Sequence, residues 1–154
     1  MTREADRTTS CRPDDAGRLE TPRDAHALLP HGAPFSLVDQ IVGILPDGGF
    51  SRSIVRAENP LLDEFGELAR EALPEYAAQT AAALDSLKRG GRVSPGFLVE
   101  VVDSVFSGAA REGSVIEAET RVEYEFERWR GIRFRVAADG KPVAEGLLKI
   151  CIFD

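Results

Sequence analysis

The sequence predicts an α+β domain in which one antiparallel sheet of about six strands wraps around one long central helix. Three observations predict it. One strong helical segment stands alone near the middle of the chain, strand-like apolar segments flank it on both sides, and apolar and charged residues alternate with period two after it. Strands joined by short turns form an antiparallel sheet, and a lone helix must cover one face of that sheet.

The length of the chain indicates one domain, and its charge disfavours two classes of protein. The 154 residues carry 26 acidic and 19 basic side chains, a formal net charge of −7. A single domain is expected over residues 25–154, whereas residues 1–24 are expected to form a disordered or loosely attached extension, because they contain almost no large apolar side chain. The negative charge disfavours proteins that coat nucleic acid or bind anionic membranes.

Several other signals are missing from the sequence. It contains no apolar run of about 18 residues and no signal peptide, so a cytoplasmic protein without a membrane partner is expected. Cys11 and Cys151 lie far apart and match neither a disulfide framework nor a metal site. No phosphate-binding loop, dinucleotide fingerprint or Ser-His-Asp arrangement is recognisable, and no cofactor is predicted.

The segment before the helix is predicted to form a hairpin. Residues 25–29 favour a short helical turn. Strands are expected over residues 36–45 and 50–57, because both are rich in apolar residues and the Pro-Asp-Gly-Gly stretch at 46–49 has the composition of a turn. A polar loop, residues 58–70, then leads to the helix.

The segment from Pro74 to Lys88 is the strong helix. Proline suits the first turn, and no breaker follows before Gly90. Apolar residues recur at helical spacing and alanine occupies much of the remainder, so another layer can approach the helix axis closely. Such a helix is expected to be wrapped rather than placed on a surface.

Four strands are predicted after the helix, over residues 97–106, 116–127, 132–136 and 143–153. A turn near residues 128–131 would place Glu125 opposite Arg133, a favourable cross-strand pair. Two strands, one helix and four strands in this order, with an alanine-rich central helix, are the arrangement of the hot-dog fold. A hot-dog domain is normally half of a dimer with a continuous sheet. We therefore expect a homodimer, with a heterodimer formed with another hot-dog subunit as the alternative.

The two histidines are the first candidates for chemistry, because a general base near neutral pH is most often histidine. His26 lies beside the polar tail and is expected to be an ordinary surface residue. His31 lies in a stiff loop that leads into the first strand. It either fastens this loop by hydrogen bonds or acts as a base.

Glu75 is the carboxylate of greatest interest. It stands in the first turn of a nearly uncharged helix, where it could simply complement the helix dipole. A wrapped helix is nevertheless a poor place for a merely solvated charge, and a carboxyl group in such surroundings can serve as an acid. Gln79, four residues later, lies on the same helix face and would orient Glu75.

Lys88, Arg89 and Arg92 form the densest basic patch of the sequence. Cations at the end of a helix complement its dipole, which is one explanation for the patch. The alternative is a docking point for an acidic partner or a phosphate group.

Three segments resemble a known family: LLPHGAPFSLVDQIV (residues 28–42), ALPEYAAQTAAAL (72–84) and SPGFLVEVVDSVF (94–106). The first two resemble the 3-hydroxyacyl-[acyl-carrier-protein] dehydratases of the FabA/FabZ hot-dog type. They are more similar to the divergent branch associated with aryl-polyene biosynthesis, and the third segment fits the third strand of that branch. The resemblance covers about residues 25–154.

The resemblance implies elimination of water from a 3-hydroxyacyl thioester, carried on acyl carrier protein or coenzyme A, in fatty-acid-like or polyene biosynthesis. In FabZ-type enzymes a histidine removes the C2 proton, a helix carboxylate from the other subunit protonates the departing hydroxyl, and a backbone N–H polarises the thioester carbonyl. Glu75 falls on the position of that carboxylate, and Gln79 on the glutamine four residues later. Gly96 and Phe97 fall in the strand expected to bind the substrate.

The chain departs from this family at two places. The histidine-bearing HFPGHP loop before the helix has no counterpart, since residues 61–73 contain no histidine. Glu100 stands where a glycine often occurs in the divergent branch. Three hypotheses follow: a dehydratase in which His31 is the base and Glu75 the acid, a hot-dog thioesterase in which Glu75 activates water, or a non-catalytic hot-dog subunit that pairs with an active dehydratase.

Overall fold

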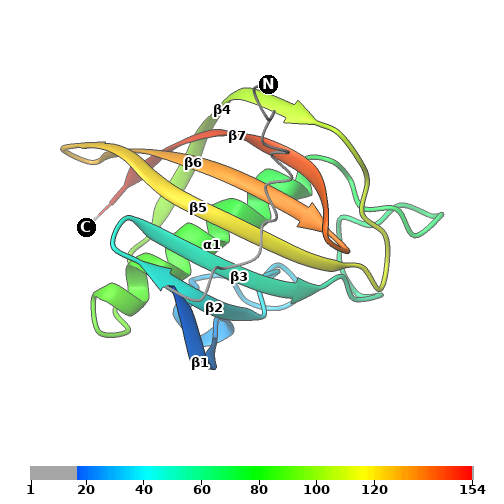
Figure 1. Ribbon diagram of the computed structural model, residues 1–154, viewed down its shortest axis with the longest axis horizontal. Helices are drawn as coiled ribbons and strands as arrows, with labels where there is room; N and C mark the ends of the chain where they lie inside the picture. The colour runs from blue at the N-terminus through cyan, green and yellow to red at the C-terminus, as the bar shows by residue number, and fades with distance from the viewer. Residues whose placement is uncertain (1–16, 154) are drawn as a thin grey trace, which may run out of the picture.

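The computed structural model describes residues 17–153, and their strands form one antiparallel sheet that curves around one helix (Figure 1). The strand order is β1-β2-β3-β5-β6-β7-β4, so that β1 and β4 are the two edges of the sheet. The elements in chain order are β1 (Arg18–Asp24), the 3-10 helix η1 (His26–Leu28), β2 (Gln40–Leu45), β3 (Gly48–Ile54), α1 (Ala72–Lys88), β4 (Gly96–Phe106), β5 (Val115–Phe126), β6 (Trp129–Ala138) and β7 (Lys141–Ile152). This arrangement is the predicted hot-dog fold.

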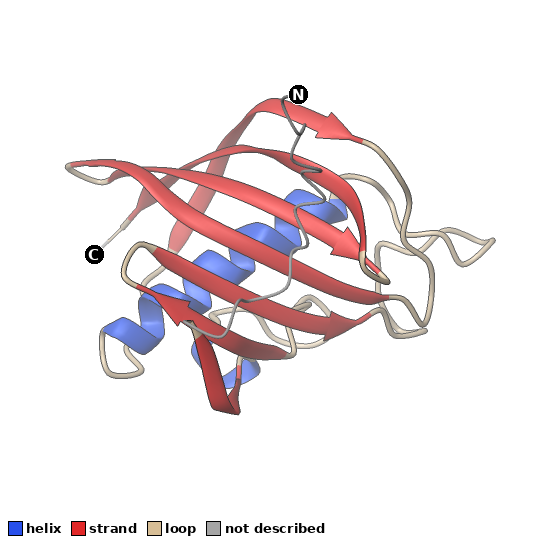
Figure 2. Cartoon of the chain, in the orientation of Figure 1, coloured by secondary structure: helices blue, strands red, loops and turns tan. Residues whose placement is uncertain are grey.

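Helix α1 lies against the concave face of the sheet and crosses the direction of the strands (Figure 2). Leu73 and Tyr76 are each 1% exposed beneath the strands, and Ala77 and Ala83 are fully buried. Because alanine has only a methyl group, the strands can approach the helix closely at these positions. The helix is therefore wrapped, as predicted. In the described part of the chain, no helix is long and apolar enough to cross a membrane.

One stripe of α1 is left only partly covered. Glu75, Ala78, Ala82 and Asp85 follow one another at helical spacing, with Ala81 beside them, and all five are half-buried. We call these five residues the alanine stripe. It is the face of the helix on which a ligand can be placed.

Strand β1 is absent from the sequence-based prediction. Residues 18–24 were expected to belong to a loosely attached extension, and this is wrong because they pair with β2 along one edge of the sheet. Nearly all side chains of β1 are exposed, and Leu19 is the one that packs against the core. This strand is therefore held mainly by its backbone hydrogen bonds to β2. Such bonds leave no apolar pattern in the sequence by which the strand could be predicted. Residues 1–16 lie outside the described residues.

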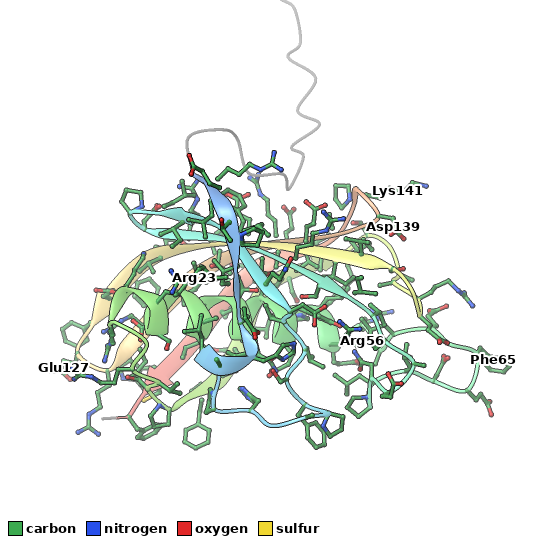
Figure 3. The ribbon with its side chains drawn as sticks, turned by 90° about the horizontal axis from the view of Figure 1, so that it is seen from below. Arg23, Arg56, Phe65, Glu127, Asp139 and Lys141 are labelled. Carbon is green, nitrogen blue, oxygen red and sulfur yellow. The ribbon has the colours of Figure 1, made fainter. Side chains whose placement is uncertain are left out.

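The register of the β5–β6 hairpin also differs from the prediction. Strand β6 begins at Trp129, so the turn is shorter than expected, and a bulge follows Val122. Glu125 consequently faces Arg130, and Arg133 faces Arg121. The turn at Glu127 and the loop tip at Phe65 lie at opposite ends of the molecule (Figure 3).

Candidate active site

A groove of about 860 Å³ runs between the alanine stripe and the inner face of the sheet. Its helix wall consists mainly of alanine methyl groups. Its sheet wall has an apolar part, formed by Leu98, Val122, Ile132, Ile150 and Ile152, and a polar part that includes Glu123, Glu125 and Arg130. A groove of this size with a largely apolar lining and a few polar groups is typical of a site for a small or extended ligand.

His31 and Glu75 meet at one end of this groove. The first turn of α1 carries Glu75, and the loop between η1 and β2 carries His31. His31 Nε2 lies 3.8 Å from Glu75 Oε1, and the two side chains are 37% and 34% exposed. The candidate base and the candidate acid therefore lie side by side in one chain, whereas the family resemblance implies a base and an acid from two subunits. Both groups are open to the groove and to solvent.

Gln79 fixes the orientation of Glu75 and also holds the loop that carries His31. Its side chain is buried, and Nε2 donates hydrogen bonds to Glu75 Oε1 at 3.0 Å and to the Phe35 carbonyl oxygen at 2.9 Å. The Leu37 N–H donates to Gln79 Oε1 at 2.8 Å. These bonds explain why the strand predicted over residues 36–45 begins only at Gln40: the backbone before it binds the helix.

The loop is fastened by His26 and not by His31. Among the described residues, no group forms a hydrogen bond with the His31 ring, so a loop-fastening role for His31 has no support. His26 Nδ1 instead lies 2.7 Å from Ser36 Oγ, and its Nε2 lies 3.1 Å from Asp39 Oδ1. His26 is exposed, as expected, but its ring binds two polar groups, which the sequence did not predict. Ser36, His26 and Asp39 thus form a Ser-His-Asp arrangement that is not recognisable from the sequence, because their spacing follows no known motif.

Tyr76, next to Glu75 in the sequence, is buried and does not line the groove. Burial, together with a smaller contribution from the negative charge of Asp39, raises the pKa of Tyr76 from 10.0 to about 12. The hydroxyl group accordingly remains protonated at physiological pH. It accepts a hydrogen bond from Asn59 Nδ2 at 3.1 Å, a contact that stabilises the loop before α1.

Gly96 and Phe97, the predicted substrate-binding residues, line the groove at the start of β4. The Phe97 ring is 64% exposed and packs edge-on against Phe153, with ring centroids 5.0 Å apart. Glu100 is not part of the groove lining. It accepts a hydrogen bond from Lys149 at 3.0 Å, and this bond raises the pKa of the Lys149 ammonium group.

The basic patch lies at the other end of α1 from Glu75. Lys88 lines the groove and donates to the Pro46 carbonyl oxygen at 3.2 Å. Arg89 is paired with Asp85 at 3.1 Å, and Arg92 is exposed. With a helical rise of about 1.5 Å per residue, the patch begins roughly 20 Å from Glu75. The described residues contain no group of three His, Cys, Asp or Glu side chains that could hold a metal ion.

A sheet wrapped around one helix defines a hot-dog domain, and the imidazole and carboxyl group at the end of its groove form a candidate acid–base site. Residues 23–151 match the model of the ApeP-like family, described as ApeP dehydratase. The chain therefore belongs to the ApeP-like dehydratase family, which confirms the resemblance to the divergent dehydratase branch.

Solved structures share this fold. A chain of the dehydratase heterocomplex ApeI:P from Xenorhabdus doucetiae is similar with a TM-score of 0.76 and 19% identity, over 86% of this chain and 92% of that one. A hypothetical thioesterase from Streptococcus pneumoniae TIGR4 with coenzyme A has a TM-score of 0.57 and 11% identity, over 73% of this chain and 86% of that one. At these identities the similarity shows the fold alone. No match was found among curated proteins.

Proposed function

We propose that this chain dehydrates 3-hydroxyacyl thioesters carried on acyl carrier protein to the 2-enoyl product, in fatty-acid-like or polyene biosynthesis. The observation that carries the proposal is the His31–Glu75 pair, 3.8 Å apart at the end of an apolar groove. Membership of a dehydratase family supports the same reaction class. The groove suits an extended acyl chain, which would lie along the alanine stripe.

The proposed reaction needs one base and one acid. Neutral His31 takes the proton from C2, the C–H electrons form the C2–C3 double bond, and the C3–O bond breaks. Glu75, in its protonated form, gives its proton to the departing hydroxyl, which leaves as water. Because Glu75 Oε1 accepts from Gln79, we place the acidic proton on Oε2. The water molecule that forms can relay the proton of His31 back to Glu75, since Nε2 and Oε1 lie 3.8 Å apart and one water can bridge them, and the pair is restored.

Thioester hydrolysis is the second candidate function. Glu75 could activate a water molecule for attack on the same thioester. The hypothetical thioesterase whose structure contains coenzyme A has the same fold as this chain. The two reactions differ in which bond breaks. Dehydration leaves the acyl group on its carrier, whereas hydrolysis releases it as a free acid.

The test follows the acyl group by mass spectrometry. A 3-hydroxyacyl carrier protein is incubated with the purified chain, alone and together with a second hot-dog subunit of the same family. We expect the acyl carrier to lose the mass of one water molecule and the thioester to remain intact. Release of free acid would identify a thioesterase. Dehydration in the mixture that survives Glu75→Gln in this chain would identify a non-catalytic subunit, and no reaction in either sample would contradict the proposal.

Strand β4 is the edge at which we propose that another subunit pairs. Strand β1 covers β2 at the opposite edge, which leaves the outer side of β4 without a partner in the described part of the chain. Phe97, Val99 and Val105 of β4 are each more than half exposed. An exposed apolar edge strand of this length is normally covered. In a homodimer, or in a heterodimer with another hot-dog subunit, the sheet would continue across β4 and the second subunit would close the groove beside Gly96. The ApeI:P heterocomplex supports the heterodimer.

The basic patch is proposed to dock the carrier protein. Carrier proteins are acidic and this chain has a net charge of −7, so attraction requires a local positive surface. Reversing the charges of Lys88, Arg89 and Arg92 to glutamate is expected to weaken carrier binding by about tenfold or more at low salt. Titration calorimetry with the unacylated carrier measures this affinity.

The control variant reverses the charges of three cations elsewhere on the surface. Arg23, Arg52 and Lys141 are exposed cations that lie outside the groove lining, and their replacement by glutamate changes the net charge equally. This control should lose little affinity. Equal losses in both triple variants, or no loss in the first, would remove the basic patch from the docking site.

A further inference from the structure

We infer that His26 is a positioning residue: its ring ties the loop of residues 27–35 to the sheet, and thereby holds His31 against Glu75. The inference rests on the proposed function, because the placement of His31 affects a rate only if His31 acts on the substrate. Its structural part, that His26 orders this loop, can be measured without any activity.

The tip of the loop that carries His31 has no apolar anchor of its own. Leu28 and Leu29 are buried where it begins, and Leu37 is buried where it ends, but residues 30–35 between them are all exposed. An exposed segment without buried side chains opens at little cost in free energy. The position of His31 therefore depends on the buried leucines at the two ends of the loop and on the polar contacts made there.

The His26 ring provides such a contact, and it joins three parts of the chain. Asp39 is fixed to β3, because its Oδ2 accepts the Ile54 N–H at 2.8 Å and its own N–H donates to Ser53 Oγ at 3.1 Å. A carboxylate can only accept, so the hydrogen on His26 Nε2 points at Asp39 Oδ1. Nδ1 of the neutral ring then accepts from the Ser36 hydroxyl at 2.7 Å. Residue 26 is thereby tied to both residue 36 and the sheet.

The same loop is held on its other side by the catalytic helix. Ser36 lies between Phe35 and Leu37, whose backbone groups bind Gln79. Gln79 therefore holds only the second limb of the loop, residues 35–37. In the first limb, from residue 26 to His31, Leu28 and Leu29 are buried, and the polar tie to Asp39 comes from the His26 ring and from the backbone bond of the Ala25 N–H to the Asp39 carbonyl oxygen.

Loss of the ring should consequently misplace His31 without unfolding the domain. Leu28, Leu29 and Gln79 remain in place, and the ring itself is nearly half exposed. Displacement of a catalytic group by about 1 Å can cost on the order of a hundredfold in rate. Since the groove is not altered, the loss should fall on kcat and leave KM nearly unchanged.

The experiment compares His26→Ala with wild type and with a matched control, Arg111→Gln. Arg111 also ties a loop through exposed polar contacts, to Glu67 and to the Phe65 carbonyl oxygen, at a distance from the groove. We expect His26→Ala to lower kcat by about tenfold or more at constant KM. Hydrogen exchange should become faster in the amides of residues 27–37 and stay unchanged in β5 and β6. Arg111→Gln should change neither.

A conservative variant separates positioning from packing. His26→Gln can still place a donor near Asp39 and should recover part of kcat, whereas His26→Phe keeps only the ring shape and should recover none. Unchanged exchange in residues 27–37, or faster exchange throughout the sheet, would contradict the inference. If the exchange is local but wild type itself dehydrates nothing, the loop-ordering role stands and the proposed function fails.

Discussion

Replacing Glu75 with glutamine is expected to lower kcat for dehydration by about a hundredfold or more, with almost no change in the free energy of unfolding. Glutamine has the shape of glutamate, and its amide oxygen can still accept the Gln79 hydrogen bond that now reaches Glu75 Oε1 at 3.0 Å. It has no acidic proton to give to the departing hydroxyl. Steady-state kinetics and urea denaturation measure the two quantities on the same preparations.

The matched control is Glu71→Gln. Glu71 is the residue immediately before α1, one turn ahead of Glu75; it is exposed and does not line the groove. It carries the same charge near the same helix end, so any general effect of removing a negative charge there appears in both variants. Activity of Glu75→Gln comparable to that of Glu71→Gln would show that Glu75 is not the acid.

Gln79→Leu is expected to destabilise the domain by about 2–4 kcal/mol, because two backbone groups lose their hydrogen-bond partner. Gln79 is 2% exposed, and leucine fills a similar volume without an amide. The Leu37 N–H and the Phe35 carbonyl group then have no acceptor or donor at this place. Dehydration should also decrease, since Glu75 loses its orienting bond and the second limb of the His31 loop is released.

Gln40→Leu is the corresponding control, because Gln40 is the other glutamine of the chain and is exposed on β2. Urea denaturation should show a much smaller change for this variant. Equal stabilities of the two leucine variants would mean that the three hydrogen bonds of Gln79 contribute little to folding. They would contradict the claim that Gln79 holds the loop that carries His31.

Most of the fold could be predicted from local sequence signals. Pro74 and the run of alanines predict a helix that begins within two residues of the observed start, and β4 to β7 follow their apolar patterns. Strand β1 could not be found, since it buries almost no side chain. The hairpin register was missed because a bulge after Val122 shifts the pairing, and bulges depend on contacts that periodicity does not encode.

The candidate site shows a similar division. Glu75 and Gln79 share a helix face, which the spacing of four residues predicts, and their hydrogen bond is present. His31 lies beside Glu75 of the same chain only because its loop, 44 residues earlier in the sequence, folds back onto the helix. The spacing of residues does not predict this fold-back. The role of His26 was missed because its partners, Ser36 and Asp39, are brought to it by the loop itself.

A crystal structure with a non-reactive 3-hydroxyacyl pantetheine analogue, solved for this chain with its pairing subunit, tests most directly whether His31 and Glu75 of one chain act on one substrate. We predict that the C3 hydroxyl lies within hydrogen-bond distance of Glu75, that C2 lies next to His31 of the same chain, and that the acyl chain follows the alanine stripe. Reacting carbons placed beside an imidazole and a carboxyl group of the other subunit, or outside the groove, would contradict the account.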